Sequence, residues 1–101
     1  MNTDTLWQFL MEHQGREYRT AKQLPFTYQI RGGEMFVDRK AKSITRATVE
    51  RAYRRILEDD EHNIQGPKAL NCFGAPYLWA IFVTLGIASP PKRQRIDATE
   101  E

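Results

Sequence analysis

Positively charged side chains are concentrated in the middle of this sequence, where their number suits the binding of a polyanion. Residues 16–55 contain eleven Lys and Arg against four acidic residues, although the whole chain carries a net charge of only +2. Several cations on one surface bind a phosphate backbone, because each neutralised phosphate releases condensed counterions. The candidate contact residues are Arg39, Lys40, Lys42, Arg46, Arg51, Arg54 and Arg55, and Thr48 adds a short polar group that can reach a DNA groove.

The same arginines have a second interpretation, in which they only keep a helix soluble. Glu50 and Glu58 lie four residues either side of Arg54, and Asp59 lies four residues after Arg55. Opposite charges at this spacing pair along the surface of a helix. Among these arginines Arg51 has no acidic neighbour at helical spacing. Charge alone therefore leaves nucleic-acid binding and plain solvation both open.

Catalytic or metal-binding patterns are absent from the sequence. His13 and His62 are far apart, and Cys72 lies in an apolar run where an inert thiol is the more common case. Neither Gly32-Gly33 nor Gly74 has the spacing or the following Lys that cradles phosphate. We therefore predict a non-catalytic protein without a metal or cofactor, and nothing in the sequence indicates a small-molecule substrate.

The elements that must position the basic residues begin with a short helix and a hairpin. An apolar stripe starting after Thr3 or Asp4, either of which can cap, predicts a helix that ends at Gly15. A loop or a third short strand follows over residues 15–25. Residues 26–39 then form two β-prone runs joined by Gly32-Gly33, which favours a tight hairpin turn.

A two-residue turn fixes which side chains of the hairpin face the core. It places Arg31 opposite Glu34, Ile30 opposite Met35, Tyr28 opposite Val37 and Phe26 opposite Arg39. The buried face would then consist of Phe26, Tyr28, Ile30, Met35 and Val37. On the opposite, polar face Phe36 is the single large apolar residue.

The run from Ile44 to Leu57 predicts an amphipathic helix with Thr45 as its N-cap and Ile44 as a hydrophobic staple on Val49. Its apolar side would consist of Val49, Ala52, Tyr53, Ile56 and Leu57. Arg51, Arg54 and Arg55 fall on the opposite side. We therefore expect this helix to cover the hairpin and to present its arginines to water.

The C-terminal part is apolar and ends in a polar tail. After the breaker Gly66-Pro67, residues 69–91 carry no charge, and Gly74 with Pro76 marks the start of a helix that Gly86 ends. Residues 77–85 are apolar on nearly every side, which predicts a helix central to the core or docked on a partner. A membrane span is disfavoured, because Asn71, Thr84 and the Gly74/Pro76 interruption leave too short an apolar helix.

Residues 45–52, TRATVERA, resemble the start of the recognition helix in winged-helix regulators of the GntR type. That resemblance implies that Arg46 and Thr48 touch DNA, although in that family the wing hairpin follows the recognition helix, whereas here the hairpin precedes it. The order of strands before helix is also similar to the arm-binding domains of tyrosine integrases. This second resemblance implies an interface on the sheet, at Thr27, Gln29, Arg31 and Phe36.

Together these features predict a single α+β domain over residues 1–88, in the order helix, hairpin, helix and apolar C-terminal helix, followed by a disordered polar tail over residues 89–101. The single cysteine and the acidic N-terminal residues predict a reducing, cytoplasmic location. The expected function is nucleic-acid binding, with DNA favoured over RNA. The alternative is a protein-interaction module or homodimer that uses exposed apolar residues such as Phe36, Trp79 and Phe82.

Overall fold

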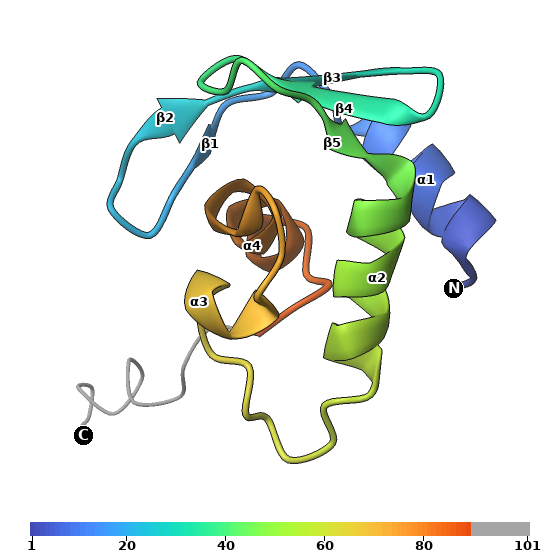
Figure 1. Ribbon diagram of the computed structural model, residues 1–101, viewed down its shortest axis with the longest axis vertical. Helices are drawn as coiled ribbons and strands as arrows, with labels where there is room; N and C mark the ends of the chain where they lie inside the picture. Colours follow the sequence, from blue (N-terminus) through green and yellow to red (C-terminus); the bar gives the residue numbers. More distant parts are fainter. Residues whose placement is uncertain (90–101) are drawn as a thin grey trace.

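The computed structural model describes residues 1–89 and has an α+β fold, as the sequence predicts. Its elements are α1 (Thr3–Glu12), β1 (Tyr18–Arg19), β2 (Pro25–Phe26), β3 (Tyr28–Arg31), β4 (Glu34–Val37), β5 (Ile44–Thr45), α2 (Arg46–Leu57), α3 (Pro67–Leu70) and α4 (Ala75–Thr84). The strands arch over α4, and α2 runs beside it (Figure 1). Of the predicted tail, residues 90–101 lie outside the described part of the chain.

The hairpin β3–β4 has the predicted register. Arg31 pairs with Glu34, Ile30 with Met35, and Tyr28 with Val37. All five residues of the predicted buried face are buried, and Phe36 on the other face is exposed, so this part of the prediction is confirmed. Two-residue turns fix register because a slip by one residue would turn every apolar side chain outward.

Phe26 does not face Arg39, so the prediction of that outermost pair was wrong. The ladder stops at Thr27, whose amide donates to the Asp38 carboxylate at 3.0 Å. Phe26 instead pairs with Tyr18 across a second, two-stranded sheet formed by β1 and β2. Strand β1 is the third short strand that the sequence left open. Its Tyr18 pairs with Phe26, and the two aromatic rings stack with their centroids 5.8 Å apart.

Helix α1 begins one residue earlier than predicted and is joined to the sheet at its end. Its N-cap is Asn2, whose side-chain oxygen accepts from the Thr5 amide at 2.7 Å, rather than Thr3 or Asp4. The hydroxyl of Tyr28 donates to the Leu10 carbonyl at 2.6 Å. Burial raises the pKa of the Tyr28 hydroxyl, which therefore stays protonated as a donor. The same carbonyl also accepts from the backbone amide of the C-cap His13 at 3.2 Å, so the tyrosine adds a second donor at the end of the helix.

Helix α2 confirms the predicted cap and most of the predicted faces. The Thr45 hydroxyl accepts from the Thr48 amide at 3.3 Å, and Val49, Ala52 and Tyr53 are buried. Leu57 is 58% exposed, so its assignment to the buried side was wrong. It is the last residue of the helix, where the chain turns away from the core.

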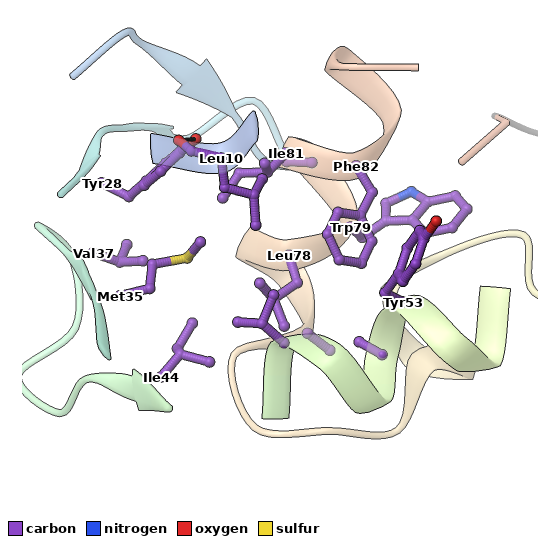
Figure 2. Packing of buried hydrophobic residues seen from close by; sticks show 14 of the residues in the cluster. Leu10, Tyr28, Met35, Val37, Ile44, Tyr53, Leu78, Trp79, Ile81 and Phe82 are labelled. Atoms are coloured by element: carbon purple, nitrogen blue, oxygen red, sulfur yellow. Dashed lines mark hydrogen bonds between the residues drawn. The ribbon is translucent and has the colours of Figure 1, made fainter. Parts of the chain in front are cut away.

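Helix α4 is the centre of the hydrophobic core. Gly74 is its N-cap, with the left-handed φ of +76° that glycine adopts readily, and a proline lies in the first turn, as predicted. Trp79 is 6% and Phe82 0% exposed, so their predicted place on an exposed apolar surface was wrong. In Figure 2 the α4 side chains stand between those of the sheet and Tyr53 of α2. No helix within residues 1–89 is both long and apolar enough to cross a membrane.

The segment between α2 and α4 contains more structure than the breaker Gly66-Pro67 predicts. Pro67 opens the short helix α3, which ends at Asn71 in the left-handed conformation. Proline suits a first helical turn, because the missing N–H would have had no partner there. Helix α3 and the following residues 71–74 bring the chain back alongside α2, which decides the surroundings of the arginines.

Candidate nucleic-acid interface

The arginine side of α2 is open to solvent, as predicted. Arg51, Arg54 and Arg55 are exposed in the structure. Within residues 1–89, none of the three guanidinium groups forms an ion pair, because the ion pairs there join Arg19 to Glu17 and Arg46 to Asp4 and Glu50. The pairs that the helical spacing predicts for Arg54 and Arg55 do not form. These cations therefore keep charge that a ligand can neutralise.

Two of the three acidic neighbours of these arginines are engaged elsewhere, and the third, Glu58, forms no ion pair within residues 1–89. Glu50 accepts from Arg46 at 2.6 Å, one turn towards the N-terminus, rather than from Arg54. Asp59 accepts from the backbone amides of Asn63 at 2.8 Å and Ile64 at 2.7 Å, where it closes the loop after α2. These two amide hydrogen bonds hold the pKa of Asp59 below its usual range.

Arg46 differs from the other arginines because its guanidinium is already occupied. It bonds to Asp4 of α1 at 2.5 Å and to Glu50 at 2.6 Å, and it lies 5.4 Å from the ring centroid of Trp7. The hydrogen bond to Glu50 is the largest cause that raises the pKa of Arg46. Arg46 therefore joins α1 to α2 and is not free to contact DNA while these bonds last.

Thr48, the other predicted polar contact, takes part in the helix cap. Its hydroxyl shares a hydrogen bond of 3.1 Å with the hydroxyl of Thr45, and its amide donates to the same Thr45 oxygen. Both polar groups that the resemblance to winged-helix regulators assigns to DNA thus have partners inside the protein. We therefore leave Arg46 and Thr48 out of the proposed contact surface.

The basic link before β5 lies against an aromatic ring that the sequence analysis did not select. The Lys40 ammonium stands 4.4 Å from the ring centroid of Phe73, and that of Lys42 stands 6.0 Å from it. Phe73 belongs to the loop between α3 and α4 and is 44% exposed. Arg39, the third cation of the link, is exposed and donates to the Pro25 carbonyl at 3.5 Å.

Close packing holds this loop in place. A Cβ atom on Gly74 would lie 2.4 Å from Cδ1 of Ile44, far inside contact distance, so the loop backbone presses directly on β5. Ile44 itself is fully buried. Phe73, the neighbour of Gly74, is therefore carried on a backbone that the core fixes.

Arg55 and Arg51 of α2 lie near α3 and Cys72, the part of the chain that leads to Phe73. Arg55 donates from Nη2 to the carbonyl of Ala69 at 2.9 Å, which ties α2 to α3. Burial raises the pKa of the Cys72 thiol, while the positive charges of Arg51 and Arg55 act on it in the opposite direction. Residues 69–72 thus connect Phe73 to the arginine side of α2. We call the surface formed by Phe73, Lys40, Lys42, Arg51 and Arg55 the Phe73 patch.

Sequence reasoning found the four cations of the Phe73 patch but missed its aromatic centre. Phe73 follows Leu70 and Cys72 in an uncharged run, and nothing in that run separates an exposed phenylalanine from a buried one. The exposure is set by the loop between α3 and α4, which only the folded chain shows. A scan for aromatic residues beside glycine at a helix start would have selected Phe73 without showing which cations surround it.

A small cavity and the possible metal ligands of residues 1–89 do not form a second candidate site. A cavity of about 180 Å³ lies at the end of α2, below the ~300 Å³ at which ligand pockets begin. It is lined by Ile56, Leu57, Asp59, His62, Ile64, Ile87, Ala88 and Ser89. Within residues 1–89, no three of the His, Cys, Asp and Glu side chains are grouped so that they could hold a metal ion.

Comparisons with protein-family models, with curated proteins and with solved structures gave no match for this chain. Its function is therefore inferred from its own residues, above all from the open arginine side of α2.

Proposed function

We propose that this protein binds nucleic acid, with DNA as the expected partner, through the Phe73 patch together with Arg54, and that it has no catalytic step of its own. The observation that carries the proposal is the open arginine side of α2. Arg51 and Arg54 are exposed and, within residues 1–89, have no carboxylate partner. Unpaired guanidinium groups of this kind attract a phosphate backbone, and dissolved salt screens this attraction.

The cations of the Phe73 patch come from two separate elements of the fold. Lys40 and Lys42 belong to the link before β5, and Arg51 and Arg55 belong to α2. Phosphates along a strand are spaced by several ångströms, so cations from separate elements can neutralise more than one of them. The engagement of Arg46 favours contacts to the backbone over reading of base edges.

The alternative function is an interaction through exposed apolar residues, of which three were named. Two of these three, Trp79 and Phe82, are buried. Of the three only Phe36 is exposed, and the other large exposed apolar residues of the described chain belong to separate segments, at Met1, Leu24, Leu57 and Phe73, which leaves this function without a specific surface. We therefore do not carry that function further.

The proposal is tested by fluorescence anisotropy with a labelled duplex DNA and its single strand, at about 50 mM and about 200 mM salt. The test variant is Arg51→Ala with Arg54→Ala, because Arg55 also bonds to Ala69 and its loss could disturb the fold. We expect weaker binding and a slope of log K against log salt that is smaller by about 2, since each phosphate contact contributes about 0.9 for a duplex.

A matched control removes a charge from another surface. Arg31→Ala deletes a cation on the exposed face of β3, where it stands over Phe36 at 5.2 Å. We expect this variant to bind as the wild type does. Binding that is unchanged in the double variant, or lost equally in Arg31→Ala, would contradict the proposed interface. No binding of either probe by the wild type would end the proposal.

A further inference from the structure

We infer that the Phe73 patch is built for an unpaired nucleic-acid strand, with the ring of Phe73 stacking on one base while the surrounding cations hold the flanking phosphates. This inference rests on the proposed function and names its substrate class. It starts from an unusual combination, in which a solvent-exposed aromatic ring lies within 6.0 Å of two lysine ammonium groups. Surfaces that bind single strands combine cations that follow the backbone with aromatic rings on which bases stack.

The position of Phe73 is difficult to explain by the folding of the chain alone. The loop backbone is already fixed by the contact of Gly74 with Ile44, so the core does not need the Phe73 side chain. Exposing a large apolar ring gives up the stabilisation that burial would provide. A ring held outward on a rigid loop is instead prepared to receive a flat partner without further loss of conformational freedom.

The lysine over the ring does not prevent stacking. A cation–π contact at an exposed site favours the contact about 2- to 5-fold, whereas stacking of a base on an aromatic ring is worth about 5- to 150-fold in affinity. A base can therefore displace Lys40 from the ring face. The displaced ammonium stays on its flexible side chain close to the ring, where the phosphate next to the stacked base would lie.

Duplex DNA cannot use the ring in this way. Its bases are stacked on one another, and their flat faces are inaccessible without local opening. A duplex would meet the cations of the Phe73 patch and gain nothing from the ring. The ring therefore separates the two forms of nucleic acid, whereas Arg51 and Arg54 serve both.

Phe36 supplies a matched control. It is exposed to a similar extent, 37% against 44%, and also has a cation above its ring, Arg31 at 5.2 Å. However, Glu34 shares its face of β4, with Asp38 next along that face. Carboxylates at this position repel phosphate, so we expect no strand to bind there.

The experiment compares Phe73→Leu with Phe36→Leu, measuring anisotropy with a labelled oligothymidine of about 16 nucleotides and with a duplex of similar length. Leucine keeps an apolar side chain but removes the ring. Phe73→Leu should weaken strand binding about 5- to 150-fold and leave duplex binding within about twofold. Phe73→Tyr, which keeps the ring, should bind the strand as the wild type does, and Phe36→Leu should change neither affinity.

The outcomes separate this inference from the proposed function. If Phe73→Leu leaves strand binding unchanged, or weakens duplex binding by the same factor, the stacking role is wrong while nucleic-acid binding stands. If Phe73→Tyr is as weak as Phe73→Leu, the loss comes from the loop and not from the ring, and the inference is again overturned. If the wild type binds neither probe, both ideas are wrong.

Discussion

Phe36 and Phe73 are two exposed phenylalanines of this α+β fold, and their surroundings differ. Each ring has a cation nearby, and their exposures are similar. Around Phe36 the outward side chains include carboxylates, and one arginine of the paired strand lies over the ring. Phe73 lies on a loop with two lysines close to its ring, and the charges of two arginines of α2 act on Cys72, its neighbour in the sequence.

The difference between the two regions lies in how the cations reach the ring. Arg31 reaches Phe36 because the hairpin register places it on the neighbouring strand. Lys40 and Lys42 reach Phe73 only because a loop about thirty residues later in the sequence packs against β5. A cation beside an aromatic ring is thus common on a sheet, but a ring surrounded by cations from distant segments requires the whole fold.

The largest expected effect comes from the glycines that support the two rings. Gly74→Ala should lower the free energy of unfolding by about 2–4 kcal/mol, because it combines a left-handed backbone with a Cβ that would clash with Ile44. Gly32→Ala, in the turn next to Phe36, also has a positive φ but open space around it, so we expect a loss of about 1–2 kcal/mol. Urea denaturation measures both, and equal losses would show that the loop carrying Phe73 is not held by Ile44.

The next effect tests whether the lysines next to Phe73 act on phosphate. Lys40→Ala with Lys42→Ala should reduce the slope of log K against log salt for a single strand by about 1.4, because each contact contributes about 0.7. Arg31→Ala should leave the slope unchanged. Anisotropy titrations at several salt concentrations give the slopes. A smaller slope in Arg31→Ala, with no change in the lysine variant, would mean that phosphate contacts the region of Phe36 and not that of Phe73.

The contrast between a cation that is paired within the protein and one that is not can be tested within α2. Arg46→Ala should lower the melting temperature, because it removes the bonds to Asp4 and Glu50, and should leave the salt dependence of binding unchanged. Arg51→Ala should do the opposite. Thermal unfolding followed by circular dichroism, together with the anisotropy titration, separates the two, and the same behaviour in both variants would refute the distinction.

The smallest expected effect concerns Asp59, whose bonds to backbone amides leave Arg55 without its predicted partner. Since the pKa of Asp59 is lowered in the folded protein, its carboxylate stabilises the fold above the ordinary aspartate pKa of about 3.9 and loses this effect as the pH falls through the lowered value. Asp59→Asn should therefore be slightly less stable than the wild type at neutral pH, and the gap should close in acid. A gap that stays constant with pH would mean that the charge has no part in holding the loop.

The patterns that local chemistry controls were read correctly from the sequence. The register of the hairpin follows from Gly32-Gly33, and the open side of α2 follows from the spacing of Arg51, Arg54 and Arg55. The helical ion pairs of the alternative interpretation do not form within residues 1–89: Glu50 and Asp59 bind other partners, and Glu58 forms no ion pair there. Spacing along a helix shows which charges can meet, but it does not show which ion pairs form.

What the sequence by itself determined, then, is the α+β order of elements, the buried face of the hairpin and the basic character of the central segment, because each depends on residues within a few positions of one another. Only the tertiary structure decided that Trp79 and Phe82 are buried, that Arg46 is held by Asp4, and that Phe73 is exposed among Lys40 and Lys42. The physical reason is the same in each case. A long-range contact forms where the packed core places two segments, and the position of the core is a property of the whole chain.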